Sequence, residues 1–285
     1  MAHTYKNSKV DLTATSVTTV YTVPTATTSI VKSILVSDDS GSGDTITLTI
    51  TNGSDVFSLF KTKTISANGT LELNGNITVS GDWSDGGALT AGTNTVTFDG
   101  SGAQTITSGG STFYSLTNNN TSGSAVSLSD AFVMNGSGTL TTNSGTTFSL
   151  NGQAFNSNSG TITNNGTFQL NGDETLSSAT TIGGSGTTKF VDASGATLTT
   201  GFAGLADVEF NSSGQTFTLG EDMTYISGDV TIAAGTTLDA SGSNYDISLT
   251  GNWSSSGTFT PQNGTVTFNG SSAQTISGTT NTFYL

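Results

Sequence analysis

The sequence predicts an all-β protein, in which a small antiparallel β-sandwich over residues 1–73 precedes a parallel β-solenoid over residues 74–285. Three observations predict this fold. Apolar residues alternate with Thr or Ser, Gly interrupts the chain about every ten residues, and one segment occurs twice. Alternation with a period of two places every second side chain on the same face of a strand. Thr is β-branched and suits the solvated face of a pleated sheet.

The composition raises the alternative of a disordered chain. Ser, Thr, Asn and Gly make up 158 of 285 residues, and charged residues make up 9%, against roughly 25% in ordinary globular chains. Tracts of such composition often fail to fold. Here, however, Val, Ile, Leu and Phe are spread evenly, and residues 45–51 place Ile46, Leu48 and Ile50 on one face. This pattern favours folded strands.

Several kinds of chemistry are excluded by residues that the chain lacks. It has no Cys and no Arg, and its one histidine is His3. The chain therefore lacks the residues for disulfides, zinc–thiolate sites, thiol nucleophiles and histidine-based triads. The net charge of −14 opposes binding to nucleic acid or to anionic membranes. We expect no cofactor and no metal, and we interpret His3 as a solvated terminal residue.

The charge is divided between two modules. Residues 1–63 hold five Lys and five acidic residues, whereas residues 64–285 hold fifteen acidic residues and only Lys189. Residues 1–16 lack the apolar core of a secretion signal. No stretch approaches the ~18 apolar residues that span a bilayer. We expect no membrane insertion and a chain released into the cytoplasm of the cell that makes it.

The first module is predicted to be a small antiparallel sandwich or sheet. Asn52-Gly53 is a strong hairpin signal between two strands. Asp38, Asp39 and Asp44 lie in a Gly/Ser-rich loop, which we interpret as a solvated hairpin loop. The alternative is a calcium loop, although the spacing departs from that of an EF-hand. The predicted strands are residues 10–23, 29–37, 44–51, 55–65 and 69–73.

The second module contains an internal repeat. Residues 81–114 and 251–284 align without a gap at an offset of 170, with 18 of 34 positions identical. Trp83 aligns with Trp253. Between the two copies runs a looser cadence of phenylalanines, at Phe148, Phe168, Phe190 and Phe210.

A unit of about 21 residues fits eight times into this offset and suits one coil of a β-solenoid with Gly/Asn corners. Stacked coils place equivalent residues roughly 4.8 Å apart, so inward apolar side chains form ladders. Stacked like charges would repel one another, which accounts for the scarcity of charge. The alternative is that the cadence marks the hairpins of a Greek-key domain.

The opening residues resemble a known kind of module. Residues 2–73, from AHTYKNSKVDL to NGTLEL, resemble the small β-module of virion structural proteins of marine tailed bacteriophages, cyanophages among them. The remainder is similar to the Gly/Thr/Asn-rich solenoid repeats of phage fibres and of large bacterial surface adhesins. The resemblance implies a virion component such as a tail fibre, a spike or a capsid-attached appendage.

Catalysis is a further alternative, because β-solenoid spikes can cleave polysaccharides. Glycoside hydrolysis needs two carboxylates about 5–10 Å apart. Asp207 and Glu209 lie on one face of a predicted strand, and two further pairs are adjacent acids, Glu221-Asp222 and Asp173-Glu174. Basic partners and aromatic platforms for such sites are scarce in this chain. We therefore interpret the carboxylates as solvated or corner residues and predict no catalytic residues.

The repeated aromatic residues are interpreted as packing residues. Trp83 and Trp253 occupy equivalent positions of the two copies, which indicates coil architecture rather than a sugar platform. The pairs Phe113-Tyr114 and Phe283-Tyr284 also repeat and are expected to pack.

The sequence thus predicts a non-enzymatic structural protein of a bacteriophage virion. Residues 1–73 would bind other virion proteins of the capsid, portal or tail, and the acidic solenoid would project. We expect a homotrimer, because exposed strand edges favour partners, and a host-surface glycan is a candidate partner. The alternatives are a capsid decoration or cement protein and a bacterial surface adhesin.

Overall fold

The computed structural model describes most of the chain from Asp44 onward. The described residues are 19–23, 44–52, 55–65, 70–86, 88–174, 176–177, 182–191, 195–198, 204–279 and 282–284. The chain divides into two compact units, residues 1–37 and residues 38–285. The predicted domain boundary at residue 73 stays a prediction.

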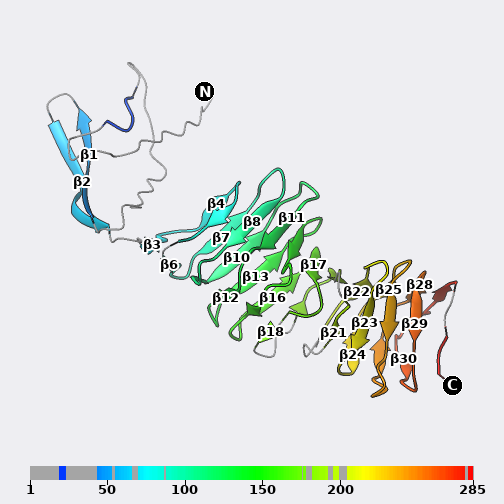
Figure 1. Ribbon diagram of the computed structural model, residues 1–285. Coiled ribbons are helices and arrows are strands. Elements are labelled where there is room, and N and C mark those ends of the chain that lie inside the picture. Colours follow the sequence, from blue (N-terminus) through cyan, green and yellow to red (C-terminus); the bar gives the residue numbers. More distant parts are fainter. Residues whose placement is uncertain are drawn as a thin grey trace, which may run out of the picture. The chain divides into compact units, whose positions relative to one another are not determined.

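One antiparallel hairpin precedes the solenoid in sequence (Figure 1). Its strands are β1 (Asp44–Asn52) and β2 (Asp55–Ile65), and Asn52 pairs with Asp55 across the turn. Both predicted strands are thereby confirmed, whereas Gly53 of the predicted turn lies outside the described residues. The remainder of the predicted sandwich lies outside the described residues, as do Asp38, Asp39, His3 and the strand predicted at 29–37.

The strand predicted over residues 10–23 is not found where the structure describes it. Residues 19–23 carry no strand assignment, and the side chains of Val20, Tyr21 and Val23 are all exposed. Alternating apolar residues specify a strand through the face that they bury, and here no face is buried.

From Thr70 onward the strands pair in parallel, which confirms the predicted β-solenoid. Strand β3 (Thr70–Glu72) pairs in parallel with β6 (Ala88–Thr90). Within the described residues every further pairing between these short strands is also parallel.

The longest sheet, called the long sheet below, has ten strands. Its strands are β5 (Trp83–Ser84), β8 (Gln104–Thr107), β11 (Ala125–Leu128), β14 (Thr147–Ser149), β17 (Thr167–Leu170), β20 (Thr187–Phe190), β22 (Asp207–Phe210), β25 (Val230–Ile232), β28 (Trp253–Ser255) and β31 (Ile276–Gly278).

Two other faces complete each coil. A six-stranded sheet precedes the long sheet in the earlier coils, and a three-stranded sheet takes that place in the later coils. The six strands are β4 (Ile77–Val79), β7 (Thr95–Phe98), β10 (Ser115–Asn118), β13 (Thr139–Thr142), β16 (Thr161–Asn164) and β19 (Ile182–Gly183). The three strands are β24 (Met223–Ile226), β27 (Ile247–Leu249) and β30 (Val266–Phe268).

The strands on the third face make two four-stranded sheets, besides the two-stranded sheet of β3 and β6. The first comprises β9 (Thr112–Phe113), β12 (Phe132–Met134), β15 (Phe155–Asn156) and β18 (Leu176–Ser177). The second comprises β21 (Thr197–Leu198), β23 (Thr216–Leu219), β26 (Thr237–Asp239) and β29 (Thr258–Thr260). Each coil is therefore three-sided.

Coil length differs along the stack. Phe168 pairs with Phe148 in a short central coil, whereas Ile106 pairs with Trp83 and Ile276 with Trp253 across longer coils. The predicted value of about 21 is confirmed. A sharp corner uses the predicted Asn-Gly chemistry, since Asn151 and Gly152 both have positive φ values, 53° and 74°.

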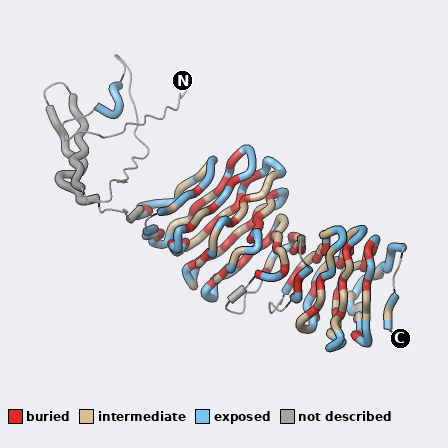
Figure 2. The backbone as a smooth tube through the Cα atoms, viewed as in Figure 1, coloured by how far each residue is buried: buried red, intermediate tan, exposed pale blue. Residues whose placement is uncertain are grey.

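The core is a set of apolar ladders. One ladder runs in register along the six-stranded sheet and consists of Ile77, Val96, Leu116, Leu140, Ile162 and Ile182. Figure 2 shows the resulting alternation along the strands, in which buried positions mostly alternate with intermediate ones. Each fully buried aliphatic or phenylalanine side chain contributes about 1.5–3 kcal/mol relative to an exposed one.

Phenylalanines stack between coils in two inward rows. The Phe148 and Phe168 rings are stacked with centroids 6.1 Å apart, and Phe190 and Phe210 are stacked at 5.1 Å. The next register position after Phe168 is Thr188, while Phe190 pairs with Leu170. The step from Phe168 to Phe190 therefore crosses from one inward row to its neighbour.

One inward row contains polar residues where apolar residues were expected. Asn118, Thr142 and Asn164 pair in register and are fully or almost fully buried. Asn164 Nδ2 donates to the Thr187 carbonyl at 3.0 Å, and Asn164 Oδ1 accepts from Gly166 N–H. Its amide therefore satisfies the backbone of the corner into the long sheet.

Candidate functional site

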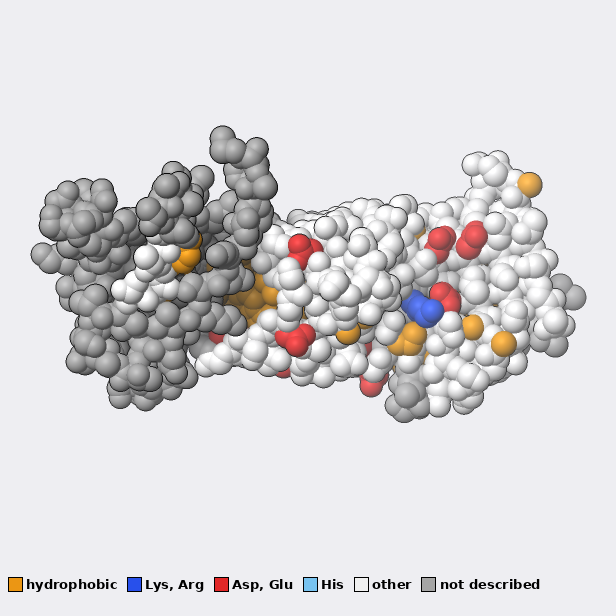
Figure 3. All heavy atoms as spheres, turned by 90° about the horizontal axis from the view of Figure 1, so that it is seen from above, with side chains coloured by type: hydrophobic (Ala, Val, Ile, Leu, Met, Phe, Trp, Pro, Cys, Tyr) orange, Lys and Arg blue, Asp and Glu red, His pale blue; other side chains and the backbone are white. Residues whose placement is uncertain are grey.

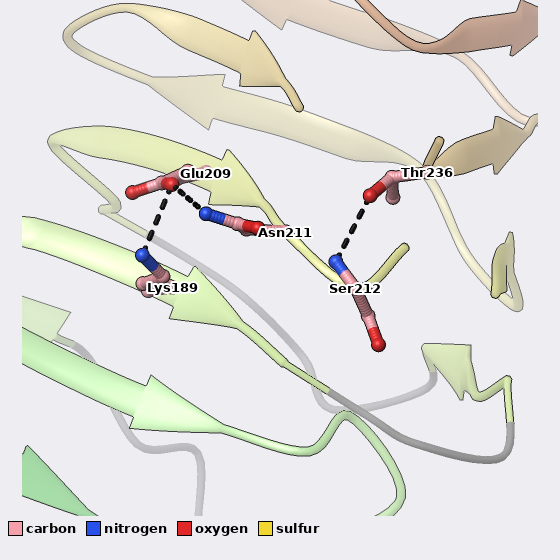
Figure 4. Close-up of polar contacts among 5 residues, drawn as sticks. All are labelled: Lys189, Glu209, Asn211, Ser212 and Thr236. Atoms are coloured by element: carbon pink, nitrogen blue, oxygen red, sulfur yellow. Dashed lines mark hydrogen bonds and ion pairs between the residues drawn. The ribbon is translucent and has the colours of Figure 1, made fainter. Parts of the chain in front are cut away.

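Asp207 and Glu209 lie on the outer side of β22, as predicted, but they have structural partners. Lys189 Nζ lies 3.1 Å from Glu209 Oε1, and Asn211 Nδ2 donates to the same oxygen at 2.6 Å (Figure 4). Lys189 and Glu209 face one another across β20 and β22. Asp207 Oδ1 accepts from Asp229 N–H. Both carboxylates thus join neighbouring coils.

The Asp207 contact is the first step of what we call the Asx column, made of Asp207, Asp229 and Asn252. Asp229 Oδ1 accepts from Asn252 N–H at 2.6 Å, and Asn252 Oδ1 accepts from Thr275 N–H at 2.9 Å. Each side chain therefore receives the backbone N–H of the following coil. Two carboxylates are stacked, and the third position is the neutral Asn252.

Asp222 begins a similar series at the entry to the three-stranded sheet. Its Oδ1 accepts from Asp246 N–H at 2.9 Å, and Asp246 Oδ1 accepts from Thr265 N–H at 2.7 Å. The third position is again uncharged. Glu221, the neighbour of Asp222 in sequence, is half-buried.

Glu174 is a buried carboxylate that binds backbone N–H groups. It accepts hydrogen bonds from Asn171, from Gly172 and, one coil earlier, from Gly152. The adjacent Asp173 is exposed. Because its oxygens accept from the N–H groups of a corner of the fold, Glu174 is placed to hold that corner.

The tryptophans pack inside the solenoid, as expected. Trp83 makes an edge-to-face contact with Phe113 at 5.2 Å, and the fully buried Trp253 makes one with Phe259 at 4.9 Å. Phe283 packs against Trp253 at 5.6 Å. The packing predicted for both phenylalanines is confirmed, whereas Tyr284 is 57% exposed.

The two copies of the repeat form the same kind of corner between strands. Gln104 Oε1 accepts from Gly100 N–H at 2.8 Å, and its Nε2 donates to the carbonyls of Val79 and Gly81. Gln274 makes the same contacts with Gly270, Leu249 and Gly251. We call these two sets of contacts the glutamine clamps.

The outer surface of the described part is mostly uncharged, with scattered carboxylates (Figure 3). Within that part, no group of three or more His, Cys, Asp or Glu side chains is arranged to hold a metal ion. None of its elements is a helix that is long and apolar enough to cross a membrane.

Sequence reasoning missed a hollow on the three-stranded sheet. It has a volume of about 280 Å³ and lies beside Tyr225, whose side chain is 70% exposed. The signal was present in the order Met-Thr-Tyr-Ile at residues 223–226. Two residues separate the buried Met223 and Ile226, where the neighbouring strands β27 and β30 have one residue at that place.

Comparisons with models of protein families, with curated proteins and with solved structures found no match to this chain.

Proposed function

We propose that this chain is a non-enzymatic structural protein of the fibre or spike type, built to present a β-solenoid at the surface of a bacteriophage virion. The observation that carries the proposal is that polar side chains bind neighbouring coils of the stack. Asp207, Glu209 and Glu174 all hold neighbouring backbone or side-chain groups of the stack. Such use suits a stiff support, because each coil is joined to the next through side chains as well as through the sheets.

The virion assignment is supported by the resemblance of residues 2–73 to a β-module of tailed-phage structural proteins. In this proposal residues 1–73 bind the capsid, portal or tail, and the acidic solenoid projects away from the particle. The proposed assembly is a homotrimer that is localised to the virion and put together in the host cytoplasm.

Purified particles test this proposal directly. Particles produced from the genome that encodes this chain would be examined by mass spectrometry and by cryo-electron microscopy, with the full chain labelled at Leu285. We expect a few to a few dozen copies per particle and a label distant from the particle surface. The absence of the chain from particles, or residues 1–73 at the distal tip, would contradict the proposal.

The same experiment separates the alternative functions. Dozens to hundreds of copies lying along the shell would identify a capsid decoration protein. Genes for outer-membrane transport beside this gene, in place of capsid, portal and tail genes, would identify a bacterial adhesin. Sedimentation of the purified chain measures its mass in solution and tests the homotrimer.

A further inference from the structure

We propose that the outer face of the three-stranded sheet carries a binding site for a neutral saccharide, with the Tyr225 ring as its platform. The inference deepens the proposed function and rests on it for its biological role. It starts from four described features of one place: a bulge, an exposed aromatic ring, a hollow and an uncharged polar rim.

The bulge projects Tyr225 from an otherwise regular stack. Met223 pairs with Ile247, and Ile226 pairs with Leu249, so β24 has one residue more than β27 between these positions. Both Met223 and Ile226 are 2% exposed, and the extra residue has to lie outside the core. β-Bulges re-aim side chains and occur frequently beside functional sites.

Packing does not explain why the Tyr225 ring points outward. At the corresponding outward place the neighbouring strands have small polar residues, Ser248 in β27 and Thr267 in β30. Tyr225 is 70% exposed, the highest value among the large exposed hydrophobic side chains of the described residues. A large ring placed outward on a rigid sheet offers contact area at a low cost in conformational entropy.

The surroundings of the ring are uncharged: most of the accessible wall of the hollow is apolar, and hydroxyl and amide side chains are among its lining residues. Besides Tyr225, the lining of the hollow includes Thr224, Ser227, Ser248, Thr250 and Asn269. Thr250 Oγ1 donates to the Ser227 carbonyl at 2.9 Å, and Asn269 Nδ2 donates to Ser248 Oγ at 3.0 Å. These bonds fix the polar groups in place and leave the Asn269 carbonyl oxygen as an acceptor.

A pyranose ring fits this combination. Its C–H face is apolar and can cover the aromatic ring, while its rim of hydroxyls matches a rim of uncharged donors and acceptors. The −14 net charge of the chain disfavours an anionic sugar. A protein partner would require a larger contiguous apolar patch. On the other side of β24, Leu205 bridges Ile226, which obstructs an added peptide strand at that point.

Nuclear magnetic resonance of the ¹⁵N-labelled full chain tests the proposal. Cellohexaose, maltohexaose, xylohexaose and chitohexaose would be titrated separately, because these chains differ in linkage and substituents but are all neutral. At least one is expected to shift the amide signals of Tyr225, Ser248 and Asn269, with a dissociation constant of about 1 mM or below.

Variants at the ring make the test specific. Tyr225→Ala should weaken binding at least about tenfold, which corresponds to 1.4 kcal/mol. Tyr225→Phe retains the ring face and should stay within about threefold of the unchanged chain. Tyr284→Ala removes another exposed tyrosine and should have no effect. Unchanged amide spectra of the saccharide-free variants at residues away from β24 show that the fold is kept.

Three outcomes would overturn the proposal. They are the absence of shifts with all four saccharides, undiminished binding by Tyr225→Ala, and capture of an apolar peptide at Tyr225 without any saccharide response. Because the purified chain is used, none of these outcomes bears on its presence in particles. Absence from particles would in turn leave a saccharide site intact.

Discussion

The central coils and the two repeat copies both stack aromatic rings between coils, but their coils differ in length. In the centre, Phe168 pairs with Phe148 across a short coil, and the two rings are stacked within 4° of parallel. In each repeat copy the coil is longer, and the tryptophan meets phenylalanine edge-to-face. The longer coils have their additional backbone groups at a corner held by a glutamine clamp.

This difference shows what a solenoid tolerates. A coil can gain residues at a corner without disturbing the sheets, provided that the N–H and C=O groups of the added residues find partners. Gln104 supplies two donors and one acceptor from a single side chain. In the central coils, the shorter side chain of Asn164 and the carboxylate of Glu174 bind the corner backbone instead, and the phenylalanine rings stack nearly parallel.

Removing a central ring should have the largest effect. Phe168→Ala deletes a fully buried ring between Phe148 and Thr188 and should lower the free energy of unfolding by about 3–5 kcal/mol. Urea denaturation measures the loss, and hydrogen exchange should place it in the central coils. Phe168→Leu, which fills more of the space, is the control and should cost less than half as much.

Removing a glutamine clamp should cost less, and unequally in the two copies. Gln104 is 1% exposed, so Gln104→Ala leaves buried groups without partners and should cost about 2 kcal/mol. Gln274 is only half-buried, and water can replace its contacts, so Gln274→Ala should cost below about 1 kcal/mol. Equal losses in urea denaturation would show that the copies are not distinguished by burial.

A stabilising change is expected in the centre. Thr188 is 1% exposed, and its Oγ1 has no hydrogen-bond partner, while its register neighbours are Phe168 and Val208. Thr188→Val should therefore raise the midpoint of thermal unfolding, with a gain of about 1 kcal/mol. The matched control is Thr146→Val, which should destabilise because Thr146 Oγ1 donates to the Asn143 carbonyl at 2.7 Å.

The smallest effect is expected at the surface ion pair. Lys189 and Glu209 are both partly exposed, and Lys189→Met should change the free energy of unfolding by less than about 0.5 kcal/mol. Denaturation at low and at high salt should differ little between the variant and the unchanged chain. A loss above about 1 kcal/mol would mean that the pair matters to the stack as much as a clamp does.

The fold followed from periodicity, whereas the irregular places did not. Alternation and the repeat predicted the solenoid and its coil length, because inward residues must recur once per coil. They could not predict that the phenylalanines move to the neighbouring inward row after Phe168. A strand has two inward positions, and either one can hold a phenyl ring. The buried Asn164 was also missed, because its inward amide satisfies local backbone groups that only coordinates reveal. Nothing in the sequence marks the buried Asn118 and Thr142, whose Nδ2 and Oγ1 atoms have no hydrogen-bond partner.

The candidate sites were harder to predict for a related reason. Carboxylates such as Asp207 and Glu174 occur at corners, where sequence alone does not distinguish a catalytic acid from an acceptor for backbone N–H groups. The Tyr225 hollow was visible only as one additional residue between two buried residues, a signal that depends on knowing the register of the neighbouring strands.

The Asx column gives the stack a direction. Asp207, Asp229 and Asn252 each present an oxygen that is filled by an amide synthesised one coil later. During translation, the side-chain acceptors of one coil would therefore be in place before the backbone amides of the next coil leave the ribosome. We expect this part of the protein to wind progressively, from its earlier residues to its later ones, during translation.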